Sequence, residues 1–288
     1  MEATIRLEHN LLAVEDEHTV HAMLELKAPP APAGPRPPLN LALVIDRSGS
    51  MAGPKLEVTK RCAAYLIRRL APSDRLALVA FDDEVTLLSP LAPARPDALL
   101  PIVRGIPVGG STNLSGGWLK GMEELGRAPA EGTRAILLLT DGQANVGITE
   151  TPALVEMARR ARAEGIGTTT IGFGEGFAED LLTGMADAGG GNAHYAATPD
   201  EAPAIFAEEF EGLVSLVAQN VSAEIRPADE VKMLGVLNEY PQVAVPGGVQ
   251  VQLGDAYAED ERRVVFELHV PEMSRLGPAR WPRSWSVT

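Results

Sequence analysis

The sequence has one cysteine and no targeting segment that can be recognised. Cys62 has no second cysteine to pair with, so no intrachain disulfide can form, and the chain does not look adapted to an oxidising compartment. Cys62 lies in an apolar helical stripe, which predicts a small buried side chain. The first ten residues contain no apolar run of the signal-peptide type. We therefore expect a cytoplasmic protein.

Basic residues and long apolar runs are also scarce. The chain of 288 residues has 25 Lys and Arg against 39 Asp and Glu, a formal net charge of −14. A nucleic-acid-binding protein needs a basic stripe that displaces counterions from phosphates, and the nearest cluster, Lys60, Arg61, Arg68 and Arg69, fits the solvated side of one helix. The longest aliphatic runs are far shorter than the roughly 20 residues that cross a bilayer. We expect no nucleic-acid partner and no membrane insertion.

Apolar runs and helical periodicities alternate between residues 39 and 218. This alternation predicts an α/β domain with a doubly wound, mostly parallel sheet. The expected strands are 39–45, 75–81, 134–140, 167–173 and 192–196, and residues 84–88 are expected to turn back as an edge strand. The first expected helix has Pro54 in its first turn. Further helices are expected over 96–104, 114–125, 152–164, 177–187 and 199–218.

The segments on either side of this domain have strand-like alternation. Residues 1–28 and 219–275 each contain too few strands to cover an apolar face alone. We therefore predict one small β-sandwich made from both segments, with the α/β domain inserted between its strands. The proline-rich residues 29–38 form the linker, because this density of proline excludes helix and sheet interior. Residues 276–288 show no regular period and are expected to be an irregular tail.

Three segments place oxygen-bearing side chains at the expected carboxyl ends of the strands. Asp46, Ser48 and Ser50 follow the first buried strand, and Asp141 follows the strand that ends at residue 140. Thr112 lies in a glycine-containing loop ahead of a helix. Ligands bind outside the carboxyl ends of the strands in open parallel sheets, so the three segments are expected to share one crevice.

These five side chains are hard oxygen donors. Mg²⁺ prefers such donors, and Mn²⁺ or Ca²⁺ is also compatible with them. The absence of cysteine and histidine from the set argues against zinc or copper. Each segment taken alone fits helix capping or a turn. The occurrence of all three in order favours a metal site.

The pattern Asp-x-Ser-x-Ser, a distant Thr and a distant Asp resembles the von Willebrand factor type A (VWA) family and its metal-ion-dependent adhesion site. Asp46, Ser48, Ser50, Thr112 and Asp141 match all five positions, and the resemblance covers about residues 38–218. It implies that the hydroxyls contact the ion while one or both aspartates act through water. The residues within and around these motifs resemble those of bacterial members of the family. It is also similar to the calcium-activated chloride channel regulator and inter-alpha-trypsin inhibitor heavy chain groups, which often have strands on both sides of the VWA domain.

The resemblance implies a divalent-cation-dependent protein-binding module, not an enzyme. The partner would supply a carboxylate to the ion, and Arg47 would steer that carboxylate. The expected contact rim consists of Arg47, Met51, Asp83, Asn113, Gln143 and Asn145. One alternative is a Mg²⁺-dependent hydrolase in the same crevice, which is disfavoured because no histidine or lysine is recognisably near. The other is a structural scaffold in which the ion only stabilises the loops.

Overall fold

The computed structural model describes residues 1–9, 12–13, 16–30, 36–129, 131–142, 144–174, 178–198, 200–228 and 230–272, and the backbone of 284–287. The chain divides into two compact units. The first, the terminal unit, combines Met1–Gly34 with Ser215–Thr288. The second, the α/β unit, is the continuous segment Pro35–Val214 between them.

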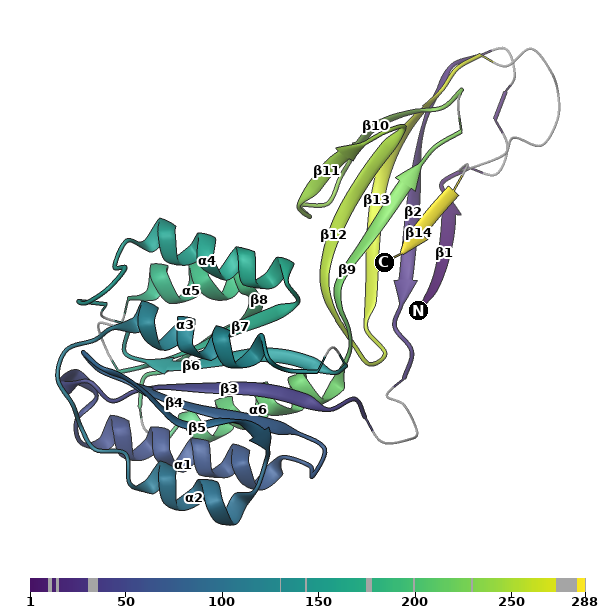
Figure 1. Cartoon of the computed structure of the whole chain (residues 1–288). Coiled ribbons are helices and arrows are strands. Elements are labelled where there is room, and N and C mark those ends of the chain that lie inside the picture. Colours follow the sequence, from purple (N-terminus) through teal and green to yellow (C-terminus); the bar gives the residue numbers. More distant parts are fainter. Residues whose placement is uncertain are drawn as a thin grey trace. The chain divides into compact units, whose positions relative to one another are not determined.

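The α/β unit is built on a six-stranded sheet with the order β5-β4-β3-β6-β7-β8 (Figure 1). All neighbouring strands are parallel except β4 and β5. Every residue of the central strand β3 is buried, as expected for a strand covered on both faces. The predicted doubly wound, mostly parallel sheet is therefore confirmed. Its strands are β3 (Leu39–Asp46), β4 (Arg75–Phe81), β5 (Val85–Pro93), β6 (Thr133–Thr140), β7 (Ile166–Phe173) and β8 (Gly190–Ala196).

Helices cover both faces of this sheet (Figure 1). Helices α1 (Pro54–Arg69), α2 (Pro96–Arg104) and α6 (Ala202–Ser215) lie on one face, and α3 (Leu114–Leu125), α4 (Thr151–Ala163) and α5 (Glu179–Gly189) lie on the other. Alternate residues of β3 serve the two layers: Leu43 packs in the α1 core and Val44 in the α3 core. None of the helices that the structure describes is long and apolar enough to cross a bilayer.

Cys62 lies on the inward face of α1 and is 1% exposed, which confirms the expected buried side chain. Burial raises the pKa of its thiol to about 12, so the thiol stays protonated at neutral pH.

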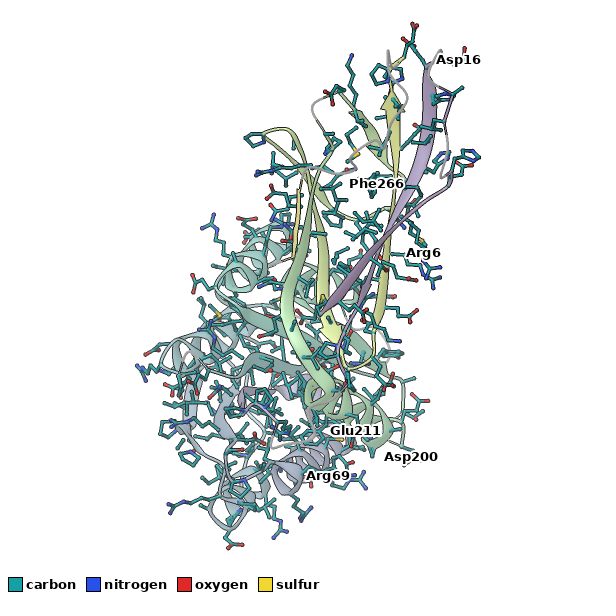
Figure 2. The ribbon with its side chains drawn as sticks, turned by 90° about the vertical axis from the view of Figure 1, so that its right-hand side faces the viewer. Arg6, Asp16, Arg69, Asp200, Glu211 and Phe266 are labelled. Atoms are coloured by element: carbon teal, nitrogen blue, oxygen red, sulfur yellow. The ribbon has the colours of Figure 1, made fainter. Side chains whose placement is uncertain are left out.

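The terminal unit contains two four-stranded antiparallel sheets. One has the order β1-β2-β13-β10 and the other β11-β12-β9-β14. Side chains from both sheets share one core, in which Figure 2 shows Phe266 between the strands. The strands are β1 (Glu2–Leu7), β2 (His18–Lys27), β9 (Leu216–Arg226), β10 (Lys232–Val236), β11 (Gln242–Val245), β12 (Gly248–Tyr257), β13 (Glu261–Val270) and β14 (Ser284–Val287).

The pairing of β2 with β13 makes this unit a joint product of the two chain ends. The two strands are in register over ten residue pairs, from Glu261 opposite Lys27 to Val270 opposite His18. The N-terminal segment thus supplies two strands to a sheet that the C-terminal segment completes. This agrees with the predicted insertion of the α/β domain between strands of one sandwich.

Three local expectations differ from the structure. The expected helix over 199–218 ends at Ser215, because Leu216 and Ala218 pair with β12 as the start of β9. The tail is not irregular throughout, since residues 284–287 form β14 alongside β9. Strands β10 and β11 were not expected, because their exposed positions interrupt a regular apolar alternation.

Candidate metal centre

The three predicted segments meet at the carboxyl ends of β3 and β6. The loop after β3 is joined to the loop before α3 by a hydrogen bond from the Gly49 amide to the Gly110 carbonyl oxygen, at 2.8 Å. The loop before α3 is joined to the segment after β6 by the Asn145 amide, which donates to the carbonyl oxygen of Thr112 at 2.9 Å. These backbone bonds fix the relative positions of the segments that carry the five predicted side chains.

Asp46 is fully buried and both of its carboxylate oxygens accept hydrogen bonds. Oδ1 accepts from the Ser48 amide at 2.8 Å, and Oδ2 accepts from the Thr140 hydroxyl at 2.6 Å. Burial raises the pKa of Asp46, the hydrogen bonds oppose this rise, and the negative charge of Asp141 adds to it. A cation beside these two carboxylates would offset both the burial and the repulsion.

The two serines present their hydroxyls together. Oγ of Ser48 lies 3.1 Å from Oγ of Ser50. Adjacent oxygen ligands of an octahedral Mg²⁺, each about 2.1 Å from the ion, lie about 3 Å apart, so this separation fits a shared ion. Ser48 is buried and Ser50 is exposed, so the pair reaches from the interior to solvent.

Asp141 has one carboxylate oxygen that accepts no hydrogen bond from the described residues. Its Oδ2 accepts a hydrogen bond from Nζ of Lys55 at 3.1 Å. Its Oδ1 is buried and has no hydrogen-bond partner among the described residues. A buried carboxylate oxygen without a donor is costly, and a bound cation would remove that cost. Thr112, also buried at 2% exposure, completes the predicted set. The residues present therefore fit a hard divalent ion.

The expectation that no lysine lies near the site is wrong. Lys55 is the second residue of α1 and forms an ion pair with Asp141, its side chain being 31% exposed. Gly174 provides the space, because a Cβ at that position would lie 2.6 Å from Cε of Lys55. The sequence did contain a signal, since α1 begins directly after the Asp46 loop and its first turn had to lie at this end of the sheet.

A third carboxylate, that of Asp82, supports the loop that carries Thr112. Asp82 follows β4, and its Oδ2 accepts from the Gly110 amide at 3.2 Å while its Oδ1 accepts from Arg47 at 3.1 Å. Burial would raise the pKa of Asp82, but the hydrogen bonds from Arg47, Glu84 and Gly110 outweigh it and lower that pKa. Sequence reasoning missed Asp82, although it stands at a strand end as Asp46 and Asp141 do.

Three of the expected rim residues have structural roles. Met51 is fully buried in the α1 core, so it does not lie at the rim. Arg47 is 13% exposed and paired with Asp82, so it is not free to steer a ligand. Asn113 caps α3, its Oδ1 accepting from the Gly116 amide at 2.9 Å.

The other three rim residues are placed differently. Asp83 and Asn145 are exposed. Asp83 lies over the Gly110 loop, since a Cβ on Gly110 would be 2.2 Å from Oδ1 of Asp83. Gln143 lies outside the described residues.

Comparison with known proteins identifies the family. The model of the von Willebrand factor type A domain matches residues 40–211, more than half of the chain, and the chain therefore belongs to the VWA family. Domains of this family commonly mediate protein–protein interaction or adhesion, and they often bind a divalent metal at the adhesion site.

Two relatives illustrate the similarity in sequence. The chain is 28% identical over 248 residues to the uncharacterized protein sll0103 of Synechocystis sp., covering 83% of this chain and 59% of that protein. It is 35% identical over 167 residues to inter-alpha-trypsin inhibitor heavy chain H3 of Homo sapiens, covering 54% of this chain and 19% of that protein. The chain thus spans less than two thirds of the length of these relatives.

Two solved structures share the fold. The von Willebrand factor type A protein from Catenulispora acidiphila has a TM-score of 0.72 at 19% identity, covering 99% of this chain and 71% of that one. The pilus adhesin SpaC from Lactobacillus rhamnosus GG, in an open conformation, has a TM-score of 0.54 at 12% identity, covering 93% and 42%. At these identities the likeness concerns the fold alone.

Proposed function

We propose that the crevice holds one divalent cation, with Mg²⁺ as the first choice and Mn²⁺ or Ca²⁺ as alternatives, and that the protein uses the ion to bind a partner protein. Asp46, Ser48, Ser50, Thr112 and Asp141 would hold the ion. The single observation that carries this proposal is the buried Oδ1 of Asp141, which has no hydrogen-bond partner among the described residues although the charge of Asp141 acts on the buried Asp46.

The donor set also favours a carboxylate as the partner's contact. Three of the five side chains are neutral hydroxyls, so an ion held there would keep much of its positive charge. When bound, the ion would act as an electrophile for an acidic side chain of the partner. Ser50 is exposed, which leaves this side of the site open to a partner. The family relationship and the pilus adhesin of similar fold are consistent with adhesion.

A hydrolase in the same crevice is the less favoured alternative. It would need a group that takes a proton from water beside the ion. Asp46 and Asp141 belong to the proposed ligand set, and Lys55 is hydrogen-bonded to Asp141. The described residues of the crevice therefore favour binding over hydrolysis.

The test is a binding comparison with a matched pair of loop variants. Thr112→Ala removes a proposed ligand, whereas Ser111→Ala removes an exposed hydroxyl from the same loop. We expect calorimetric titration with Mg²⁺ and Mn²⁺ to give at least about tenfold weaker affinity for Thr112→Ala and an unchanged affinity for Ser111→Ala. Asp46→Ala should abolish ion binding.

Partner binding is then tested by capture from a native lysate with wild type and Asp46→Ala, each with Mg²⁺ and with EDTA. A protein retained only by wild type with Mg²⁺ supports the proposal. Equal recovery in all four samples would contradict it. A large fall in Tm on chelation, with no metal-dependent partner, would instead favour the structural scaffold.

A further inference from the structure

A groove beside α1 concentrates positive charge in an otherwise acidic protein. Its volume is about 420 Å³, and it lies between α1 and the end of α2. Four of its six lining residues are cationic and one is acidic, in a chain whose formal net charge is −14. The lining residues are Glu57, Lys60, Arg61, Ala64, Arg68 and Arg104.

The groove is elongated along α1. Its α1 residues recur at three- and four-residue intervals, which places them on one side of the helix. Arg61 and Arg68 are seven residues apart, which corresponds to about 10 Å along the helix axis. Ala64 lies between them with a short, buried side chain, so nothing bulky from α1 fills the middle of the groove.

Three guanidinium groups in the groove are available to a ligand. Lys60 is bonded to Glu57 at 2.9 Å, and its side chain is only 13% exposed. Arg68 makes a long 3.5 Å hydrogen bond to the Ala64 carbonyl oxygen. Arg61 and Arg104 are exposed and have no carboxylate partner among the described residues. A guanidinium binds a carboxylate through two parallel hydrogen bonds, so these side chains can take acidic groups.

The neighbouring Arg69 does not contribute to the groove. It donates a hydrogen bond to the Tyr65 hydroxyl at 2.8 Å and lies over the Tyr65 ring, 5.1 Å from its centre. The cationic side chains that line the groove are therefore distinct from the stacked Arg–Tyr pair at the end of the helix.

We propose that this groove binds an extended acidic peptide segment of a protein partner through Arg61, Arg68 and Arg104, independently of the divalent cation. In an extended chain, alternate side chains lie on one side about 6.7 Å apart, so three acidic residues cover about 13 Å, close to the length of α1 that lines the groove. Single-stranded nucleic acid is the less suitable polyanion. The groove lining contains no aromatic side chain on which bases could stack.

The experiment is a fluorescence anisotropy titration with dye-labelled hexaglutamate, with hexaglutamine as the neutral probe, in EDTA. The double variant Arg61→Gln/Arg68→Gln is compared with Arg159→Gln/Arg160→Gln. The second variant removes the same charge from exposed positions on α4, where both arginines pair with Glu156. We expect the groove variant to bind hexaglutamate at least about tenfold more weakly than wild type, and the α4 variant to stay close to wild type. Circular dichroism and Tm check that both variants fold.

Three results would overturn the proposal: equal affinity of the two double variants, equal binding of hexaglutamine, or tighter binding of an oligothymidylate than of hexaglutamate. Repeating the titration with Asp46→Ala and with Mg²⁺ distinguishes binding in the groove from binding at the metal site. Binding that needs Mg²⁺, fails in Asp46→Ala and survives in the groove variant would refute the groove and support the metal-dependent function. Binding in EDTA that survives in Asp46→Ala supports the groove whatever the fate of the metal proposal.

Discussion

At the scale of single residues, two glycines set the position of the loop that carries Thr112. A Cβ on Gly109 would lie 1.6 Å from Oδ2 of Asp82. That carboxylate oxygen also accepts the Gly110 amide, so a side chain on Gly109 would push the loop away from the support that holds it. The absence of a side chain here therefore has a geometric consequence at the proposed metal site.

Gly109→Ala is accordingly expected to lower stability by about 1–3 kcal/mol and to weaken Mg²⁺ binding. The measurements are urea unfolding and calorimetric titration. Gly235→Ala is the control, because a Cβ there meets nothing within 4 Å and Gly235 has no positive φ. Unchanged Mg²⁺ affinity in Gly109→Ala would show that the loop position does not govern the site.

Single residues could be predicted from the sequence where a metal-binding type of side chain stood at the end of a predicted strand. The strand ends placed Asp46 and Asp141 in one crevice without any contact being known. The role of Arg47 could not be predicted in the same way, because its partner Asp82 lies 35 residues away and only the fold brings the two together. Met51 follows the serine motif directly, yet the short 3₁₀ turn of Gly49–Met51 directs it into the core.

At the scale of elements, a buried carboxylate connects α6 to the edge of the sheet. Glu209 on α6 accepts hydrogen bonds from Thr169 at 2.7 Å, from Asn192 at 2.9 Å and from His194 at 2.9 Å. Burial would raise the pKa of Glu209, but the bonds from His194, Thr169 and Asn192 outweigh it and lower that pKa below its ordinary value of 4.5. The ionised form therefore stabilises the fold.

The sign of the resulting pH dependence follows from this lowered pKa. The stabilisation by Glu209 is fully present above the unfolded-state pKa of about 4.5, and it is lost as pH falls through the lower folded-state pKa. Glu209→Gln should therefore cost about 1–3 kcal/mol at pH 7, and the difference from wild type should shrink below pH 4.5. Urea unfolding of both proteins from pH 7 to about pH 3.5 measures this. Glu208→Gln, next to it on α6, is the control, and a pH-independent difference would contradict the assignment.

Element-scale prediction depended on which contacts stabilise each element. Strands β3 and β6 were recognisable because burial on both faces demands continuous apolar residues. Strand β11 was not, since three of its four residues are exposed and its pairing with β12 is what orders it. The end of α6 was misplaced for a related reason: the apolar residues after Ser215 fit a helix or a strand, and the ladder with β12 decides between them.

At the scale of the whole chain, the α/β unit is formed by one continuous segment, whereas the terminal unit needs two segments that are far apart in the sequence. The α/β unit contains all six strands of its sheet and the helices on both faces. The first residues of this unit are also held by contacts within it, because Arg36 donates two hydrogen bonds to Asp74, at 2.8 and 2.6 Å. The terminal unit instead divides one sheet between two distant segments, and the shortage of strands in each segment is what made this arrangement predictable from sequence.

Excision should therefore affect the two units differently. A fragment of residues 36–214 is expected to fold alone, to unfold cooperatively and to have the same Mg²⁺ affinity that calorimetric titration gives for the full chain. A fragment of residues 215–288 should stay unfolded, because β13 loses the ten-residue pairing with β2, and the four buried core side chains of β2 that pack beside the four of β13 are missing. Adding a peptide of residues 1–30 should restore strand structure. Circular dichroism, thermal unfolding and amide NMR spectra measure each case.

A well-dispersed spectrum from residues 215–288 alone would show that the N-terminal strands are additions to a complete domain. An unfolded 36–214 fragment would show that the α/β unit depends on the terminal strands.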